Sequence, residues 1–371
     1  MKIVYIAFSF IPSRTANSLH VMKMCQAFSK NGHEVYLLVP DNKEEYEKNI
    51  TDIFEFYQVE PVFKVIKLPF LKLKGKILVF WLFLIYELVK IRPDLVYSRY
   101  VSGVFFASKL GFNCTFEAHN VIWDEASRDI LHFNKLIQSK HFKYLVVISE
   151  KLKEAYLQKN LIDESKVIVA HDGADPAPPH SDLENWPGRK GVLQVGYVGH
   201  LYQGKGMEIV YAIAPALPNM DFHIIGGYDQ DIVYWKSKIP HQNVHFHGFV
   251  SQDRLSAYLH QLDICLLPNQ KKVNTHGLLK KDIGHYTSPL KMFDYMAHKK
   301  TIVASDLPVL REVLQHEKNA WLCPPAKPQA WIKSLDFLEK NEVLRTKLAE
   351  CAWQDFMTHY TWKQRAIKVL S

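Results

Sequence analysis

The first forty residues contain the pattern that most limits how this chain can fold. Residues Lys2–Phe10 form a near-continuous apolar run, which is typical of a strand buried on both faces of a parallel sheet. A helix is predicted from about Leu19 to Lys30, closed by Asn31-Gly32, and the sequence HEVYLLVP from His33 predicts a second strand. Because a strand, a helix and another strand make a βαβ unit, we expect an α/β protein built on parallel sheets.

The first turn of this unit argues against one large class of α/β proteins. The turn at residues 11–18 contains no glycine, and Gly32 is the first glycine of the chain. Proteins that bind nicotinamide or flavin dinucleotides need glycines at this turn, so that the pyrophosphate can approach the backbone. We therefore do not expect a dinucleotide-binding domain at the N-terminus.

The length of the chain and one proline-rich segment indicate two domains. A chain of 371 residues exceeds the size at which a single hydrophobic core stops growing, roughly 250–300 residues. Prolines and glycines cluster between Pro176 and Gly191, and a second strand–loop–helix pattern begins at Val192. We expect an N-terminal domain over residues 1–180 and a C-terminal domain over residues 190–357.

The composition indicates which class of partner the protein binds and in which cellular compartment it occurs. The net charge of +8 and the pI near 9.0 favour an anionic partner, such as nucleic acid, an acidic membrane surface or a phosphorylated substrate. No standard nucleic-acid-binding motif is present in the sequence, so we expect no nucleic acid partner. The cysteines are far apart and include no CxxC pair, which indicates reduced thiols and neither a disulfide nor a zinc framework. The N-terminus enters a strand without a signal-peptide pattern, and we expect a cytoplasmic protein.

A glycine-rich loop follows the first strand of the second domain. Residues Gly199–Gly206 nearly match the phosphate-loop pattern GxxxxGK[ST], but Gly206 stands where the hydroxyl residue would be. That hydroxyl binds magnesium in a nucleoside triphosphatase, so its absence disfavours this class. A phosphate loop without the metal ligand suits a site that binds a diphosphate through Lys205 alone. The alternative is a surface turn with a solvated lysine.

The stretch at residues 285–312 predicts a loop, a helix, a strand and a second loop. Ser288-Pro289 suits a helix N-cap followed by the first helical residue, and apolar residues then recur at helical spacing. The start of such a helix, at Ser288–Lys291, presents unpaired backbone N–H groups that can bind a phosphate. Asp294 follows about one turn later, where its carboxylate can reach a sugar hydroxyl beside that phosphate.

These two segments together resemble the donor site of retaining GT-B glycosyltransferases of family four. Those enzymes usually carry two glutamates eight positions apart in the loop and helix, and another glutamate after a proline in a later loop. Asp294 matches the second glutamate and Glu312 the later one, whereas Tyr286 stands in place of the first. Lys205 matches the lysine that holds the pyrophosphate, and His200 stands where arginine is common.

The resemblance covers essentially the whole chain and implies both a fold and a reaction. The fold is two Rossmann-like domains that face each other across a cleft, with a C-terminal helix at about residues 358–371 crossing back to the N-terminal domain. The reaction transfers a sugar from a nucleotide-diphosphate sugar to an acceptor hydroxyl, with retention at the anomeric carbon and without a metal ion. The expected acceptor is a glycan or a lipid-linked glycan, in cell-surface polysaccharide or glycolipid assembly.

The resemblance also implies roles for single residues. His119, which follows the predicted strand Cys114–Ala118, is expected to hydrogen-bond the donor sugar. Lys205 is expected to stabilise the leaving diphosphate, and Asp294 to hold the ribose. The first turn is expected to contact the acceptor through Arg14, Asn17 and Ser18. The complete predicted donor site consists of Gly199, His200, Lys205, Phe249, Val250, Ser288, Leu290, Lys291, Asp294 and Glu312.

One helix of the first domain is apolar nearly all round. Residues Ile77–Val89 read ILVFWLFLIYELV, which is too short to span a bilayer. Lysines including Lys74 and Lys76 precede this segment, and Lys90 and Arg92 follow it. It is either a buried helix of the core or a helix that leans on an anionic membrane surface, and one helix with two faces can do both.

Three other functions remain open on the sequence alone. A binding-only relative of the same fold is compatible with Tyr286 and His200, which both depart from the usual pattern. A nucleotide-sugar epimerase is disfavoured by the glycine-free first turn, and a phosphate-loop triphosphatase is disfavoured by Gly206. The sugar, the base, the acceptor and the oligomeric state are not specified by these motifs.

Overall fold

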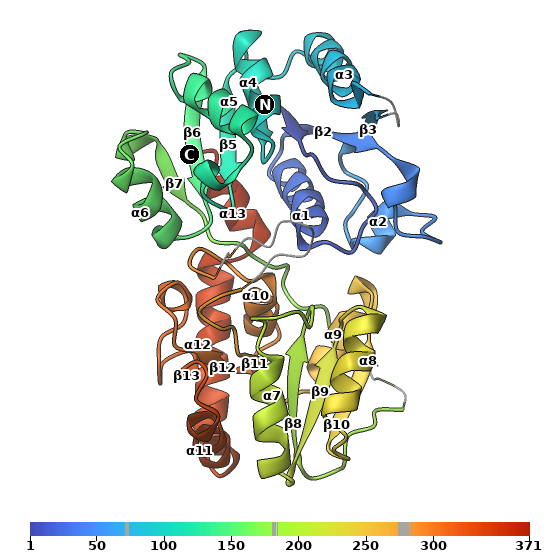
Figure 1. Cartoon of the computed structure of the whole chain (residues 1–371), viewed down its shortest axis with the longest axis vertical. Coiled ribbons are helices and arrows are strands. Elements are labelled where there is room, and N and C mark those ends of the chain that lie inside the picture. The colour runs from blue at the N-terminus through green and yellow to red at the C-terminus, as the bar shows by residue number, and fades with distance from the viewer. Residues whose placement is uncertain (71–73, 180–182, 184, 274–281, 283) are drawn as a thin grey trace. The chain divides into compact units, whose positions relative to one another are not determined.

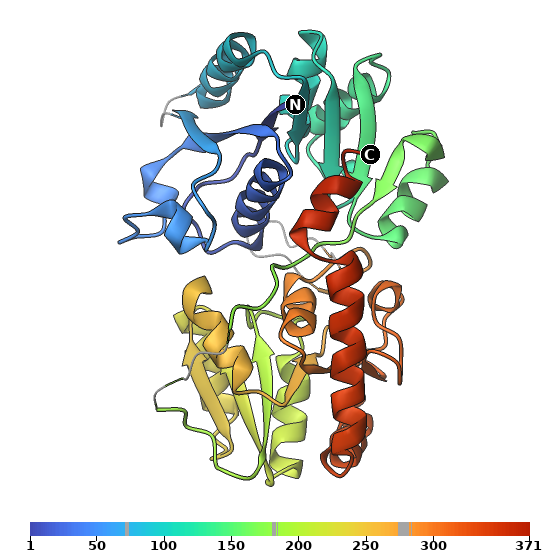
Figure 2. The same ribbon diagram turned by 180° about the vertical axis from the view of Figure 1, so that it is seen from behind.

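The chain folds into two compact units, each built on a parallel sheet. A computed structural model of the chain describes all residues except 71–73, 180–182, 184, 274–281 and 283. Unit 1 comprises Met1–Asp172 and Trp362–Ser371, and unit 2 comprises Gly173–Thr361. Figures 1 and 2 show helices on both faces of each sheet. The expectation of an α/β protein with two Rossmann-like domains is therefore confirmed.

The sheet of unit 1 has seven strands in the order β3-β2-β1-β4-β5-β6-β7. The order reverses at β1, and in sheets of this kind ligands bind at the carboxyl ends of the strands where the order reverses. The strands are β1 Lys2–Ile6, β2 Glu34–Asp41, β3 Lys64–Pro69, β4 Leu95–Ser98, β5 Cys114–Ala118, β6 Phe142–Val147 and β7 Val167–Val169.

Helices of unit 1 alternate with its strands along the chain. They are α1 Ala16–Lys30, α2 Ile53–Phe56, α3 Lys76–Ile91, α4 Val101–Lys109, α5 Ser127–Ile137, α6 Glu150–Gln158 and α13 Trp362–Lys368. Among the helices that the structure describes, none has the length and apolar character needed to cross a membrane.

Unit 2 repeats this architecture with six strands in the order β10-β9-β8-β11-β12-β13. One buried apolar cluster includes side chains of α10 and α12, and a second includes side chains of α7 and α11. The strands are β8 Leu193–Val198, β9 Met220–Ile225, β10 Val244–Gly248, β11 Ile264–Leu267, β12 Thr301–Ser305 and β13 Trp321–Cys323. The helices are α7 Met207–Ile213, α8 Asp229–Lys238, α9 Gln252–His260, α10 Leu290–Ala297, α11 Pro328–Glu339 and α12 Glu342–His359.

The first strand is shorter than its apolar run predicts. β1 ends at Ile6, although the sequence predicted a strand through Phe10. The apolar character continues because Phe8 leaves the sheet and enters an aromatic cluster, where its ring lies 5.0 Å from that of Tyr100 and 5.4 Å from that of Phe70. The following helix starts at Ala16, before the predicted Leu19, because the Thr15 side chain caps it by accepting a hydrogen bond from the backbone N–H of Ser18 at 3.2 Å.

The C-terminal helix α13 belongs to unit 1, as the predicted fold required. It packs against α1, and the two helices lie side by side in both views (Figures 1 and 2). The buried Arg365 donates from Nη2 to Oε1 of Glu117 at 2.9 Å and from Nε to the carbonyl oxygen of His171 at 2.9 Å. Burial by itself would raise the pKa of Glu117, but the Arg365 guanidinium and His20 hold it well below its usual value. Helix α13 therefore brings the cation that lets unit 1 bury an ionised carboxylate.

This buried pair generates a stability prediction. Arg365→Met leaves the Glu117 carboxylate buried without its cation, so we expect the free energy of unfolding of unit 1 to fall by about 3–5 kcal/mol. The double variant Glu117→Gln/Arg365→Met is expected to recover part of this loss, because it removes the unpaired charge. Amide hydrogen exchange of β5 and β6 under increasing urea would measure both.

The matched control is Arg128→Met, which removes an exposed arginine that lies 3.4 Å from Asp129. It is expected to change stability by no more than about 0.5 kcal/mol. If the Arg365→Met and Arg128→Met variants lost equal amounts of unfolding free energy, the structural role of the buried pair would be contradicted.

Candidate functional site

The loops at the carboxyl ends of β8, β9 and β10 are tied together by backbone hydrogen bonds. The N–H of Gly199 donates to the carbonyl oxygen of Ile225 at 2.8 Å, and the N–H of Gly226 donates to that of Gly248 at 2.7 Å. A Cβ on Gly226 would lie only 2.7 Å from the carbonyl oxygen of Gly199, so glycine is needed for this approach. The predicted residues at 199–200 and 249–250 therefore lie on neighbouring loops at one edge of the sheet.

The glycine loop packs closely on the loop that leaves β11. Gly204 and Gly206 have positive φ angles of +87° and +97°. A Cβ at either position would lie 2.2 Å from a backbone oxygen, that of Lys272 or that of Pro268 respectively. Glycine is therefore required on both sides of Lys205, and the tight loop fixes the backbone position of this lysine.

Lys205 is half-buried and lies near an aromatic ring. Its Nζ is 5.3 Å from the centre of the Tyr202 ring. Burial lowers the pKa of Lys205 to about 8, because an ammonium group loses hydration there. A bound anion would stabilise the charged form of this lysine and raise its pKa.

A second half-buried lysine lies near the first. Lys291, in the first turn of α10, has a buried Nζ that lies 3.6 Å from the centre of the Tyr197 ring and has no hydrogen-bond partner in the part of the chain described. Burial, and then the charge of Lys205, lower the pKa of Lys291 well below its usual value. A Cβ on Gly199 would lie 3.1 Å from the Lys291 Nζ, so Gly199 also leaves room for this ammonium group.

The start of α10 adds backbone donors to the same place. The N-cap is Pro289 and the first helical residue is Leu290, so the predicted N-cap at Ser288 is wrong by one position. Proline has no side chain that can cap a helix, and none of the residues that the structure describes makes a side-chain cap bond there. The first-turn N–H groups next to Lys291 thus have no capping side chain among the described residues, which suits an anion at this end of the helix.

Tyr295 holds α10 in register with the sheet. Its hydroxyl accepts a hydrogen bond from the N–H of Val198 at 2.9 Å and donates to the carbonyl oxygen of Leu266 at 3.3 Å. These contacts join α10 to β8 and β11, the two strands at the point where the strand order reverses. Lys291, one turn earlier on the helix, is thereby placed against the end of β8.

The remaining predicted donor residues lie around this centre at different depths. His200 stacks on Tyr228 with ring centres 4.9 Å apart, and its carbonyl oxygen accepts from the hydroxyl of Tyr197 at 2.6 Å. Phe249 is exposed, whereas Val250 packs on the core. Asp294 is half-buried on α10, Ser288 is buried before it, and Glu312 ends a short helical turn after β12.

In unit 1, His119 is held by a buried carboxylate. Glu117 is fully buried on β5, and its Oε1 lies 2.5 Å from Nε2 of His119. Because an ionised carboxylate only accepts hydrogen bonds, the proton of the neutral imidazole must be on Nε2. Burial and the charge of Arg99 lower the pKa of His119 to about 4, so the ring is neutral near pH 7. Its Nδ1 is therefore a hydrogen-bond acceptor, on a side chain that is about 20% exposed.

The predicted acceptor residues lie at the start of α1 in the same unit. Asn17 donates from Nδ2 to Oγ of Ser9 at 2.7 Å, and Arg14 pairs with Glu47 at 2.6 Å. Ser18 is fully buried and its hydroxyl donates to the carbonyl oxygen of Ser13 at 2.8 Å, so it stabilises the turn. One turn further along α1, the ring of His20 lies 5.0 Å from that of His119, which joins this turn to the end of β5.

Two groups of side chains have the composition of a metal site, but an arginine lies against each. Arg365 Nη2 is 2.9 Å from Glu117, and Arg189 Nε is 2.9 Å from Asp221. A guanidinium at this distance supplies the positive charge that a metal ion would supply, so neither donor set fits a resident metal. Within the described chain the two groups are His20, Glu117, His119 and Asp172, and Asp221, His223 and His245.

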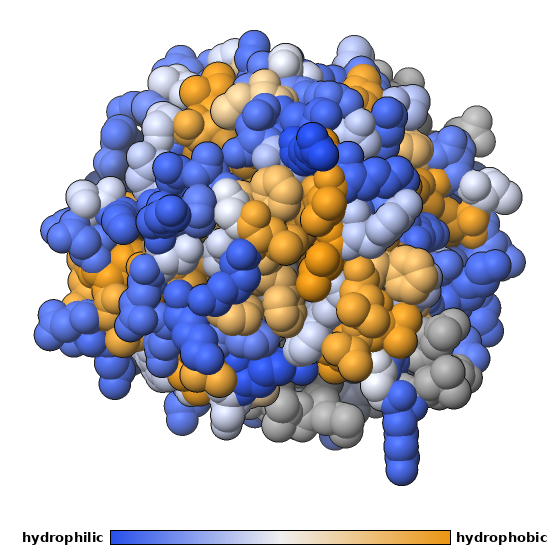
Figure 3. All heavy atoms as spheres, turned by 90° about the horizontal axis from the view of Figure 1, so that it is seen from above, coloured by the Kyte–Doolittle hydropathy of each residue, from blue (hydrophilic) through white to orange (hydrophobic). Residues whose placement is uncertain are grey.

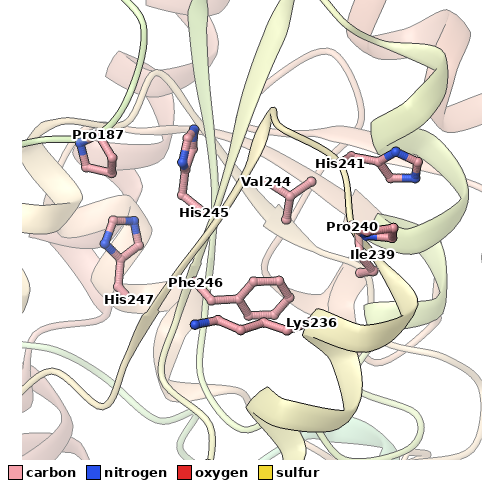
Figure 4. Close-up of a pocket in the computed structure, with 9 residues that line it drawn as sticks. All are labelled: Pro187, Lys236, Ile239, Pro240, His241, Val244, His245, Phe246 and His247. Atoms are coloured by element: carbon pink, nitrogen blue, oxygen red, sulfur yellow. The ribbon is translucent and has the colours of Figure 1, made fainter.

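A pocket of about 430 Å³ lies away from the glycine loop, beside the edge strand β10 (Figure 4). Side chains from the end of α8 and from β10 line it, and Lys236 lies along the ring of Phe246. None of the predicted donor residues is among its lining residues. We therefore place the candidate site at the glycine loop and the start of α10.

Several residues of these networks were not predicted from the sequence. Glu117 lies in the middle of an apolar strand, and this charged residue was the available signal for a buried ion pair. Arg365 gives no comparable signal, because an arginine on a short terminal helix is usually solvated. Tyr197 and Tyr295 were likewise indistinguishable from core aromatics.

Two family models match the chain. One, described as "Glycosyl transferases group 1", matches residues 193–341. The other, described as "Glycosyltransferase Family 4", matches residues 18–177. No match is found among curated proteins.

Solved structures of similar fold cover nearly the whole chain. Sucrose-phosphate synthase from Thermosynechococcus elongatus has a TM-score of 0.73 at 15% identity and covers 99% of this chain and 96% of its own. Anabaena HepE in complex with UDP-glucose has a TM-score of 0.74 at 13% identity, with coverage of 100% and 98%. The lipopolysaccharide outer core galactosyltransferase WaaB has a TM-score of 0.66 at 15% identity, with coverage of 100% and 99%. At these identities the likeness shows the fold, which is GT-B.

The position of Lys291 predicts that its replacement raises stability but weakens ligand binding. Lys291→Met removes a buried amine that has no hydrogen-bond partner among the described residues, so we expect the unliganded protein to gain about 1–3 kcal/mol of stability. The same change is expected to weaken the binding of UDP at least tenfold, because an anion contact is lost. Thermal unfolding and titration calorimetry would measure the two effects.

The control is Lys299→Met on the turn after α10, where the lysine is exposed and lies 3.0 Å from Glu350. It should leave UDP affinity unchanged. A Lys291→Met protein that is less stable than the wild type and binds UDP normally would show that Lys291 serves the fold alone.

The lowered pKa of Lys205 generates a pH prediction. A bound diphosphate favours the charged lysine and raises its pKa from about 8, so binding takes up protons and affinity falls as the pH rises through 8. We expect UDP to bind about tenfold more weakly near pH 9 than near pH 7. Lys205→Arg stays charged over this range and should lose this part of the pH dependence. Identical pH profiles for the two proteins would contradict the assignment.

Proposed function

Because this chain belongs to the family-four, group 1 glycosyltransferases, we propose that it transfers a sugar from a nucleotide-diphosphate sugar to an acceptor hydroxyl with retention of configuration. The observation that carries the proposal is the pair of half-buried lysines, Lys205 and Lys291, beside the start of α10, where no side chain of the described residues caps the helix. Their charges and the helix dipole favour a compact dianion such as a diphosphate. The solved complexes of HepE with UDP and UDP-glucose support a uridine nucleotide as the first donor to test.

The lysines act on the leaving group. When the bond from the anomeric carbon to the diphosphate oxygen breaks, negative charge grows on the diphosphate. Fixed positive charges in a site of low polarity stabilise this charge more in the transition state than in the ground state. Two ammonium groups and the N–H groups of α10 supply that charge, so we propose a reaction that needs no metal ion.

Retention is proposed to follow from attack on the face that the diphosphate leaves. The acceptor oxygen forms its bond to the anomeric carbon as the diphosphate departs, and the proton of the acceptor hydroxyl passes to the departing phosphate oxygen. Atoms and charges balance without a covalent enzyme intermediate. No residue in the candidate site is assigned as a nucleophile.

The remaining roles position the two substrates. His119 accepts a hydrogen bond at Nδ1 from a hydroxyl of the donor sugar, and its neutral state excludes it as a cationic acid. Asp294 binds the ribose, and Phe249 and Val250 contact the base. Arg14 and Asn17 contact the acceptor, while Ser18 stabilises the turn that carries them.

The proposed context is the assembly of a surface polysaccharide or glycolipid on the cytoplasmic side of a membrane. It is supported by the net charge of +8 and by the likeness to a galactosyltransferase of the lipopolysaccharide outer core. A catalytically inactive relative that binds nucleotide sugars is the second candidate. Its support is His200, which takes the place of an arginine and stacks on Tyr228.

A panel of nucleotide sugars tests the proposal. The donor should raise the melting temperature of the wild-type protein, since a ligand that binds only the native state stabilises it. With that donor, Lys205→Ala is expected to lower the transfer rate about 100- to 1,000-fold. Proton NMR of the glycoside product should show the same anomeric configuration as the donor.

Lys236→Ala is the control, because this lysine lines the separate pocket beside β10. It should transfer at the wild-type rate. Inversion in the product would overturn retention, and normal turnover by a folded Lys205→Ala protein would overturn the donor site. Binding without turnover of any donor would favour the inactive relative.

A further inference from the structure

The outer face of α3 exposes a continuous stripe of large apolar side chains. Leu78, Leu82 and Tyr86 recur at intervals of one turn and are 58%, 58% and 59% exposed. Val89 adds a 50% exposed side chain on the same side, and Phe83, on the flank next to Tyr86, is 43% exposed. The five side chains extend over about three turns, roughly 16 Å along the helix axis. Stripes of this size on a soluble protein mark an interaction site.

The stripe is separate from the face of α3 that packs into the core of unit 1. The opposite face of α3 is already buried through Phe80, Leu84 and Leu88. On its flank, Trp81 packs against Phe106 of α4 with ring centres 4.7 Å apart. The helix is therefore fixed in unit 1 by one face, and its outer face is presented outward. Seen from above, hydrophobic residues gather in several patches among hydrophilic ones on the surface of the molecule (Figure 3).

Both ends of the stripe are basic. Lys74 and Lys76 lie before it and Lys90 and Arg92 lie after it, and all four are exposed. Glu87 is the only acidic residue between positions 74 and 92. It is turned inward, and its Oε1 lies 3.3 Å from Nζ of Lys90. An apolar stripe with positive charge at each end is complementary to an acyl layer bordered by anionic headgroups.

We propose that the outer face of α3 docks unit 1 on an anionic lipid bilayer. The charges favour this partner over a second copy of the chain. In a symmetric dimer the same stripe meets itself, so the basic ends would face basic ends whether the helices ran parallel or antiparallel. A bilayer that contains anionic lipids buries the same side chains and attracts both ends.

The aromatic cluster at the start of α3 connects this surface to the carboxyl ends of the strands. The ring of Phe8, just after β1, lies 5.6 Å from that of Phe80 on α3 and 5.0 Å from that of Tyr100, just after β4. Phe8 is 37% exposed. A lipid-linked acceptor in the docked bilayer would thus meet apolar rings on its way to this edge of the sheet. This last step rests on the proposed transfer function, whereas the docking itself does not.

Sedimentation with lipid vesicles tests the docking. We expect the wild-type protein to bind vesicles of phosphatidylcholine with about 30% phosphatidylglycerol at least tenfold more strongly than pure phosphatidylcholine vesicles near 0.1 M salt. Leu78→Ser/Leu82→Ser/Tyr86→Ser should lower binding to the anionic vesicles at least tenfold. Lys74→Gln/Lys76→Gln/Arg92→Gln should remove the preference for anionic lipid.

The matched control is Val233→Ser/Tyr234→Ser/Val343→Ser, which removes three similarly exposed apolar side chains from helices of unit 2. It should bind vesicles as the wild type does. The proposal is overturned if the wild type ignores vesicles, if the α3 variant binds them normally, or if that variant changes a lipid-free dimer into a monomer. UDP affinity, measured on the same variants, should stay at the wild-type value, so a failure of the donor site would be seen separately.

Discussion

The constraint on which unit 2 depends is the partial burial of two neighbouring lysine side chains at the end of one parallel strand. Lys291 lies against the Tyr197 ring and Lys205 near that of Tyr202, with contacts of 3.6 and 5.3 Å. Like charges in a medium of low polarity repel and lose hydration, so this arrangement lowers the stability of the unliganded fold. It persists because a tight glycine loop fixes one lysine and the hydrogen bonds of Tyr295 fix the helix that carries the other. The cost is offset when an anion binds, which is the usual exchange of stability for function at a preorganised site.

In unit 1 the buried charge is negative, and it is stabilised by a cation from the same unit. Glu117 stays ionised in the core because α13, from the far end of the sequence, inserts Arg365 next to it. The carboxylate in turn fixes which nitrogen of His119 carries the proton. The C-terminal helix α13 therefore does not only pack on unit 1. Through Glu117 it also determines which nitrogen of His119, at the carboxyl end of β5, donates a hydrogen bond. Both units place their polar networks at these strand ends, where a parallel sheet leaves room for ligands.

Local patterns predicted the layout well because each depends on a few neighbouring residues. The first strand, the glycine loop and the helix at Leu290–Ala297 were all recognisable from hydrophobic spacing and turn residues. Contacts between distant segments were not accessible in this way. Neither the pairing of Glu117 with Arg365 nor the burial of Lys291 follows from spacing, since both depend on how far elements approach in space. The apolar run through Phe10 shows the same limit, because an aromatic cluster and a longer strand give the same sequence pattern.

The most direct test of the account is an NMR titration of the Lys291 side chain, with and without UDP. Lysines carrying an isotope label at Cε, assigned with the Lys291→Met and Lys205→Arg proteins, would report the pKa of each amine. The account predicts a pKa for Lys291 well below the usual lysine value in the free protein and a clear rise when UDP is bound. An ordinary pKa in the free protein, or the same pKa with and without UDP, would contradict the claim that the two lysines form the anion site.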